Sequence, residues 1–452
     1  MSCLRTTIKI MHDKTPPTDE TIRNAAQVAP RPQTLAATGL PAAFLSDLVE
    51  KHLFEGGALS MSELASRTAL SGRLLEELLS ILRQEGRIEV RAQHGKSRGL
   101  GYALTERGRG SAMASLMASG YVGPTPVPQA DYNQVVLSQS VRRRNVTREQ
   151  MFAAFADTVL DPALLDRLGP ALNSGKAIFV YGAPGTGKTF ITRRLARLFD
   201  DTCLIPHALA IGDTVIRVFD PSVHRQCQAN SPVVTLARDH DPRYVLCQRP
   251  LVVTGGELTA DMLEVWFDPA TRQYRAPLQV KANGGLLILD DLGRQRLPPT
   301  NVLNRWILPM EHGVDYLSMN TGQHCRTPFD VILVFSTNLQ PYTLVDEAFL
   351  RRIGYKIDLQ PLEPPQYHSI WQRACEARSV RYDPAICQYM IDALYLPTST
   401  PLLPCHPRDL IGMALDRSTY LQDHICLSTE ALQWAWHNYF VTTPGSAGKL
   451  AR

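Results

Sequence analysis

Two features that define other protein classes are missing from this chain: a long apolar run and a cysteine pattern. No stretch reaches the roughly 20 apolar residues that a membrane-spanning helix needs. The nine cysteines are scattered and include no Cys-x-x-Cys pair, which argues against a disulfide framework and favours a reducing compartment. The N-terminal stretch also lacks the apolar core of a secretory signal peptide. We therefore expect a cytoplasmic protein without membrane insertion.

A strong net charge is absent as well. The formal charge of +4 over 452 residues neither requires nor excludes a nucleic-acid partner. Hydrophobic residues make up 44% of the chain and charged residues 20%, as in an ordinary globular protein. The length is too great for one ordinary domain, and the 32 prolines predict loops or linkers between two or three of them.

Changes in periodicity and composition divide the chain into six segments. The first residues lack periodicity, the proline-rich stretch "YVGPTPVPQADY" marks a second break, and the last part is helical and poor in strands. We expect, in chain order, a flexible leader (1–39), a winged helix-turn-helix domain (40–120), a proline-rich linker (121–146), an α/β nucleotide-binding core (147–358), a helical lid (359–440) and a tail (441–452).

The segment after the leader has the element order of a winged helix: three amphipathic helices, then two strands around a basic, glycine-rich loop. The predicted core face of the third helix consists of Leu74, Leu75, Leu78, Leu79, Ile81 and Leu82. Its outer face carries Glu76 and Glu77, which oppose binding to phosphates. The hairpin carries Arg91, Lys96 and Arg98, which favour contact with a DNA backbone. DNA binding, protein docking and a purely structural role all stay open.

Short apolar strands alternate with helices in the α/β core. The stretches "AIFVYG", "LLILDD" and "VILVFSTN" are strands of this kind. Such an alternation indicates a parallel sheet with helices on both faces. The interval between the first two strands is long, and we expect a small β-hairpin around "DPATRQ", preceded by a helical insert.

A phosphate-binding loop follows the first of these strands. The stretch "GAPGTGKT" lies between a strand and a predicted helix, and it fits the G-x-x-x-x-G-K-[ST] pattern. Its glycines allow backbone N–H groups to turn toward phosphate oxygens. We expect Lys188 to reach the outer phosphates and Thr189 to ligate Mg²⁺. The predicted nucleotide-binding residues of the loop are Gly182, Ala183, Pro184, Gly185, Thr186, Gly187, Lys188 and Thr189.

Two adjacent carboxylates, Asp290 and Asp291, end the strand "LLILDD". Like charges in one site repel, and burial makes their ionisation costly, so we expect a cation beside them. Asp290 is the predicted second ligand of Mg²⁺. Asp291 is one residue further on and points differently, and we predict that it polarises a water molecule against the terminal phosphate.

Together these motifs resemble an AAA+ ATPase module over residues from about 147 to 440. "GAPGTGKT" matches the Walker A loop of that family and "LLILDD" its Walker B strand. The resemblance implies that Asn338, which ends "VILVFSTN", is the polar sensor that helps to hold the attacking water. It also implies arginine fingers at Arg351 and Arg352 in "DEAFLRRI", and a second sensor at Arg408 in "HPRDL". ATP and Mg²⁺ as cofactors, and a ring homo-oligomer expected to be a hexamer, follow from the same resemblance.

The chain departs from most of the family at the end of the Walker B strand. Most members have Asp-Glu there, whereas this chain has Asp-Asp, as bacterial replication-initiator, helicase-loader and transposition-helper members also do. The run "KANGG" resembles the branch with sigma-54 activators and MoxR-like remodellers, which implies an insert facing a central pore. A winged helix before such a core resembles a poorly characterised bacterial AAA+ group.

Three functions compete on this basis. The first is an ATPase that couples ATP binding and hydrolysis in a ring to the remodelling of a macromolecular client, foremost a protein. The second is a DNA-associated ATPase of the helicase-loader or transposition-helper type, which uses the winged helix on duplex DNA. The third is a slow, nucleotide-switched scaffold. Stimulation of the ATPase by DNA separates the first two, and turnover with and without Asp291 separates the third.

Overall fold

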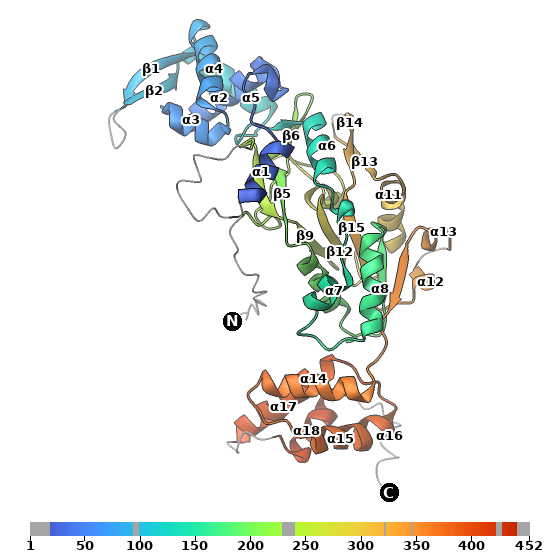
Figure 1. Cartoon of the computed structure of the whole chain (residues 1–452). Helices are drawn as coiled ribbons and strands as arrows, with labels where there is room; N and C mark the ends of the chain where they lie inside the picture. The colour runs from blue at the N-terminus through green and yellow to red at the C-terminus, as the bar shows by residue number, and fades with distance from the viewer. Residues whose placement is uncertain are drawn as a thin grey trace.

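The computed structural model describes residues 19–93, 99–227, 240–320, 322–344, 347–421 and 427–440. Its elements form an elongated molecule, with an N-terminal unit at one end and a helical lid at the other (Figure 1). Between them lie two five-stranded sheets. The predicted tail, the first eighteen residues of the predicted leader, and Lys96 and Arg98 lie outside the described residues. No helix of the described ranges is long and apolar enough to cross a membrane.

One of the two sheets is wholly parallel, with strand order β16-β4-β15-β12-β9. Its strands are, in chain order, β4 (Ile178–Tyr181), β9 (Leu251–Thr254), β12 (Gly285–Leu289), β15 (Val331–Thr337) and β16 (Tyr355–Asp358). The predicted parallel sheet is confirmed, and the three quoted strands correspond to β4, β12 and β15. Because all five strands run in one direction, their carboxyl ends share one edge of the sheet.

Helices cover both faces of this parallel sheet, as the alternating pattern predicted. One face carries α7 (Arg148–Ala154), α8 (Pro162–Asn173) and α9 (Lys188–Arg194), and the other carries α11 (Pro299–His312). Successive strand residues point to opposite faces. Ile288 therefore packs in the cluster that contains Leu168 of α8, whereas Leu287 packs with Trp306 of α11.

The N-terminal unit has the predicted order of three helices followed by an antiparallel hairpin. Its elements are α2 (Ala42–Gly56), α3 (Met61–Thr68), α4 (Gly72–Gln84), β1 (Ile88–Gln93), β2 (Gly99–Leu104) and a further helix, α5 (Glu106–Ala118). A capping box between Ser60 and Glu63 begins α3. Five of the six predicted core residues of α4 are buried, and Ile81 is half-buried.

The predicted leader and linker are corrected by the structure, because both contain ordered elements. The leader contains α1 (Asp19–Val28) and the linker contains β3 (Val127–Pro128) and α6 (Gln129–Ser138). Ala25 of α1 and Tyr132 of α6 are buried in one hydrophobic cluster. The prolines before α6 hid its helical spacing, in which Tyr132, Val135 and Val136 lie three and four residues apart.

The predicted helical insert between the Walker motifs is also wrong, because the interval is built mainly from strands. It contains β5 (Thr202–Pro206), β6 (Ala208–Ile211), β7 (Thr214–Arg217), β8 (Tyr244–Gln248), β10 (Trp266–Asp268) and β11 (Gln273–Arg275). The hairpin predicted around "DPATRQ" is confirmed as β10 and β11. Strands β10, β11, β7, β6 and β3 make the second sheet, which we call the middle sheet. The hairpin of β13 (Val314–Ser318) and β14 (His324–Pro328) packs beside it.

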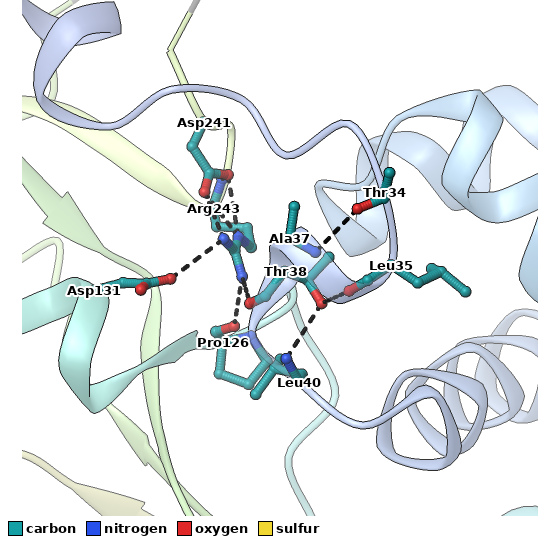
Figure 2. A network of polar contacts seen from close by, with 9 residues as sticks. All are labelled: Thr34, Leu35, Ala37, Thr38, Leu40, Pro126, Asp131, Asp241 and Arg243. Atoms are coloured by element: carbon teal, nitrogen blue, oxygen red, sulfur yellow. Dashed lines mark hydrogen bonds and ion pairs between the residues drawn. The ribbon is translucent and has the colours of Figure 1, made fainter.

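A buried arginine that directly precedes β8, Arg243, holds the two chain segments that flank the N-terminal unit (Figure 2). Nη1 of Arg243 donates to the carbonyl oxygens of Thr38, at 2.8 Å, and Pro126, at 3.5 Å. Thr38 precedes the N-terminal unit and Pro126 follows it, so one guanidinium holds both the entrance and the exit of that unit. Asp241 pairs with the same guanidinium at 2.8 Å, and Asp131 lies at 4.0 Å.

The C-terminal lid is helical, as predicted. Its helices are α14 (Pro364–Glu376), α15 (Pro384–Met390), α16 (Leu396–Thr398), α17 (Cys405–Leu421) and α18 (Thr429–Tyr439), with a π-helical turn η5 (Ile391–Tyr395) after α15. The hydroxyl groups of Tyr367 and Tyr395 are 2.6 Å apart in its core, and the Tyr395 hydroxyl lies 3.1 Å from Nδ1 of His406. These buried polar groups therefore satisfy one another.

Candidate active site

The predicted site residues gather at the carboxyl edge of the parallel sheet. The glycine-rich loop follows β4, the two aspartates follow β12, and Asn338 follows β15. These three strands are neighbours in the order β4-β15-β12, although they are far apart in the sequence. Ligands of open parallel sheets bind outside the carboxyl ends of the strands, and these side chains therefore occupy the expected edge.

Three glycines of the loop have backbone conformations that side chains rarely adopt. Gly182, Gly185 and Gly187 have φ angles of 145°, 86° and 91°. A Cβ atom on Gly182 would lie 2.5 Å from the carbonyl oxygen of Leu359, and one on Gly185 would lie 2.6 Å from Sγ of Cys405. The loop therefore requires glycine both for its curvature and for the close approach of the lid segment that begins α17.

Lys188 lies inside this loop and is only 5% exposed. Its Nζ donates to the carbonyl oxygens of Gly182 at 2.9 Å and Ala183 at 2.8 Å. Burial lowers the pKa of Lys188, and the nearby carboxylates of Asp291 and Asp290 oppose that shift. The ammonium group and the two carboxylates thus belong to one electrostatic site. Thr189, the next residue, is exposed in the first turn of α9.

The two aspartates make different contacts. Asp291 has a φ angle of 51°, in the left-handed region that aspartate tolerates better than most residues. Its Oδ1 accepts a hydrogen bond of 3.2 Å from Nδ2 of Asn338. Asp290 instead uses its Oδ1 to accept from the backbone N–H of Asp291 at 3.1 Å. The turn at Asp291 therefore separates the two carboxylates and directs one of them to the end of β15.

Two residues that the sequence analysis did not single out support this edge. Nε2 of Gln295 donates to the carbonyl oxygen of Asp290 at 3.0 Å, and its Oε1 accepts from the N–H of Gly293 at 2.8 Å. Glu257 follows β9 and accepts from the Thr254 hydroxyl at 3.1 Å. Hydrogen bonds from backbone N–H groups lower the pKa of Glu257. A polar residue just beyond a strand end is the signal that could have identified Glu257.

The predicted arginines lie on surfaces of the core and lid, paired with carboxylates. Arg351 follows α13 (Glu347–Leu350), is 76% exposed, and pairs with Glu347 at 3.0 Å. Arg352 pairs with Glu311 of α11. Arg408, in the first turns of α17, pairs with the adjacent Asp409 at 3.0 Å. These contacts point to neighbouring carboxylates rather than to the glycine-rich loop.

A cavity of about 460 Å³ opens beside the glycine-rich loop. Thr186 and Gly187 of the loop line it, together with the segment between α7 and α8, the residues after β16, and helix α14 of the lid. Arg373 of α14 contributes to this wall, whereas Arg408 does not. The lining comes from two distant parts of the chain, one before and within α9 and the other from the end of β16 into the lid, so sequence patterns alone did not reveal the cavity.

Comparisons with known proteins match parts of this architecture. A profile described as a domain of unknown function (DUF8689) matches residues 363–438, which form the lid. The RuvB Holliday junction branch migration motor of Thermotoga maritima is 14% identical, with 65% of this chain and 72% of that chain covered and a TM-score of 0.33. NtrX of Brucella abortus is 13% identical, with 60% and 52% covered and a TM-score of 0.38. No curated protein sequence matches this chain.

Proposed function

We propose that this chain is an ATP hydrolase of the AAA+ type. The observation that carries the proposal is the buried Lys188 inside a loop of three positive-φ glycines, near the two carboxylates that follow β12, the next strand but one in the sheet. Such a loop suits phosphate oxygens, because its backbone N–H groups and the lysine are all donors. Lys188 exchanges its bonds to Gly182 and Ala183 for the outer phosphates when ATP binds.

The oxygen atoms at this edge also suit Mg²⁺, which prefers oxygen ligands. The Thr189 hydroxyl is on an exposed first helical turn, and Asp290 ends β12 beside the lysine. We assign these two residues to the metal. When bound, Mg²⁺ supplies positive charge that neutralises the phosphate oxygens.

Asp291 is the residue that we assign to the attacking water. Its carboxylate accepts a proton as the water oxygen bonds to the terminal phosphorus and the bond to the bridging oxygen breaks, which yields ADP and phosphate. Asn338 holds one oxygen of Asp291 at 3.2 Å and so fixes the direction of the carboxylate. The left-handed turn at Asp291 keeps this carboxylate apart from that of Asp290.

We further propose that the subunits form a ring in which Arg351 and Arg352 act on the neighbouring subunit's nucleotide. Arg408, on the lid, is the second sensor, which contacts the phosphates of its own subunit's nucleotide. The exposed pair of Arg351 with Glu347 is weak and can be exchanged, since exposed ion pairs contribute only about 0–1 kcal/mol.

The charges of the N-terminal unit favour a protein client over DNA. Glu76 and Glu77 are exposed on α4, and Glu89 places a further carboxylate beside Arg91, at 2.5 Å.

The proposal is tested by measuring the affinity for MgATP with calorimetry. Lys188→Ala should abolish tight binding, because the loop has no other ammonium group. The matched control is Lys176→Ala, which removes an exposed lysine that precedes β4 and should leave the affinity unchanged. Equal affinities of the wild type and Lys188→Ala would overturn the phosphate-loop assignment.

A further inference from the structure

A large exposed aromatic ring lies beside the glycine-rich loop. Phe190 is the third residue of α9, directly after Lys188 and Thr189, and its side chain is 53% exposed. It lines the 460 Å³ cavity together with Thr186 and Gly187 of the loop. An apolar ring left this open costs hydrophobic free energy, so its position calls for a partner.

Arg194, one turn further along α9, covers one face of that ring. Its guanidinium carbon lies 5.3 Å from the Phe190 ring centroid and 5.9 Å from that of Phe155. Nε of Arg194 donates to the carbonyl oxygen of Ala154 at 3.0 Å, and the guanidinium pairs with Asp157. The arginine side chain is only 8% exposed, so it is a fixed support behind the phenyl ring.

The part of the cavity wall formed by the segment after β16 and the lid includes five apolar side chains, among polar ones such as Gln360 and Gln366. Leu359, Pro361 and Leu362 follow β16, Ile370 comes from α14, and Pro404 precedes α17. A phosphate group would lose its hydration against such a wall, whereas a flat heterocycle would bury its faces there. The cavity also reaches the glycine-rich loop through Gly187, so one ligand can occupy both places.

We propose that Phe190 is the stacking platform for the base of the nucleotide, with Arg194 as the cation behind it. This inference rests on the proposed function, because it concerns the same bound nucleotide. A guanidinium on one face of the phenyl ring withdraws π density, which strengthens stacking of an electron-rich base on the other face. Purines present more ring area than pyrimidines, so the platform favours ATP over CTP.

The test compares ATP with inorganic tripolyphosphate, which has phosphates but no base. Calorimetry should show that Phe190→Ala weakens ATP binding about tenfold, in keeping with the loss of one base–aromatic stack, and leaves tripolyphosphate binding unchanged. Phe190→Trp should retain ATP affinity, and Phe190→Ala should reduce the preference for ATP over CTP. Tyr420→Ala, an exposed aromatic on the lid outside the cavity, is the matched control.

The outcomes separate the stacking platform from the proposed function. Wild-type ATP affinity in Phe190→Ala would overturn the stacking platform and leave the proposed function intact. An equal loss of ATP and tripolyphosphate binding would also overturn it, because the substitution would then have disturbed the loop. A wild-type protein that binds tripolyphosphate but gains nothing from the base of ATP would contradict the platform alone. A wild type that binds neither ligand would overturn the proposed function itself.

Discussion

At the scale of single residues, the two adjacent aspartates are separated by backbone geometry. The φ angle of 51° at Asp291 turns its carboxylate toward Asn338, while the Asp290 carboxylate accepts from the N–H of Asp291. Both carboxylates lie close enough to Lys188 to act on its pKa. The sequence predicted that these residues meet. It did not predict the left-handed turn, because glycine is the usual signal for such a conformation.

Asp291→Asn isolates the charge of this carboxylate, because asparagine also tolerates the left-handed conformation. The variant should bind MgATP with wild-type affinity and hydrolyse it about 10²–10⁴-fold more slowly, as expected for the loss of a general base. Phosphate-release kinetics and calorimetry on the same sample measure the two effects. Hydrolysis at the wild-type rate would move the water-activating role to another residue.

Asp291→Glu is the matched variant, since glutamate keeps the carboxylate and adds one methylene. Glutamate lacks the tolerance for a φ angle of 51°, so unfolding free energy should fall by about 1 kcal/mol while hydrolysis is kept.

At the scale of elements, the parallel sheet was predictable and the middle sheet was not. Strands β4, β12 and β15 are largely apolar runs next to recognisable motifs, so the strands and their parallel arrangement were predicted. The hairpin of β6 and β7 was missed, although its two-residue connection, Gly212-Asp213, is a recognised hairpin signal. Helix α6 was missed because prolines precede it, and its burial depends on strands that come much later in the chain.

Arg243→Met should destabilise the junction between the start of β8 and the segments that flank the N-terminal unit. The substitution leaves the buried Asp241 carboxylate without its cation, which typically costs about 3–5 kcal/mol. Chemical denaturation measures the loss, and adding Asp241→Asn should recover part of it. The control is Arg275→Met, whose exposed pair with Asp268 should contribute at most about 1 kcal/mol. Equal effects of the two arginine variants would contradict the fastening role of Arg243.

The lid should lose stability in mild acid through His406. This imidazole is buried beside the Tyr395 hydroxyl and the Tyr439 and Phe440 rings. Burial lowers its pKa from 6.5 to about 4, although the charge of the nearby Asp409 opposes the shift. In the unfolded chain the His406 imidazole is protonated near pH 6.5, whereas in the folded lid it is protonated only near pH 4. Stability is therefore fully present above pH 6.5 and falls by about 3 kcal/mol as the pH drops toward 4, at about 1.4 kcal/mol per pKa unit.

Thermal unfolding as a function of pH measures this acid sensitivity. His406→Gln should flatten the dependence between pH 6.5 and 4, whereas His437→Gln, at an exposed histidine of α18, should leave it unchanged. An unaltered pH dependence in His406→Gln would show that other groups cause it.

At the scale of the whole molecule, the N-terminal unit and the site lie at opposite ends of the α/β region (Figure 1). The lid touches the glycine-rich loop through Cys405, whereas Arg243, just before β8, holds the segments that flank the N-terminal unit. The entrance and exit of that unit adjoin, because a Cβ atom on Gly39 would lie 2.6 Å from the Pro128 ring. The unit is thus an insertion between α1 and β3.

This arrangement predicts different outcomes for two deletions. Replacing residues 40–126 with a short glycine–serine linker should preserve folding and nucleotide affinity, because the chain ends already meet there. Removing residues 1–145 should instead give an insoluble protein, because it removes α1, β3 and α6 from the hydrophobic cluster of the middle sheet. Solubility and calorimetry distinguish the two deletion variants. A soluble, ATP-binding 146–452 fragment would contradict the assignment of those elements to the core.

The most direct test of the central claim is the release of phosphate from MgATP by the purified full chain, measured over a range of protein concentrations. The wild type should hydrolyse ATP, with a rate per subunit that rises as rings form. Lys188→Ala, and the double variant Arg351→Ala with Arg352→Ala, should each be nearly inactive, since an arginine supplied in trans contributes about 10³–10⁵-fold in rate in P-loop enzymes. A mixture of these two variants should regain activity, because each subunit supplies what its neighbour lacks. No phosphate release by the wild type at any concentration, or release that Lys188→Ala leaves undiminished, would contradict the account.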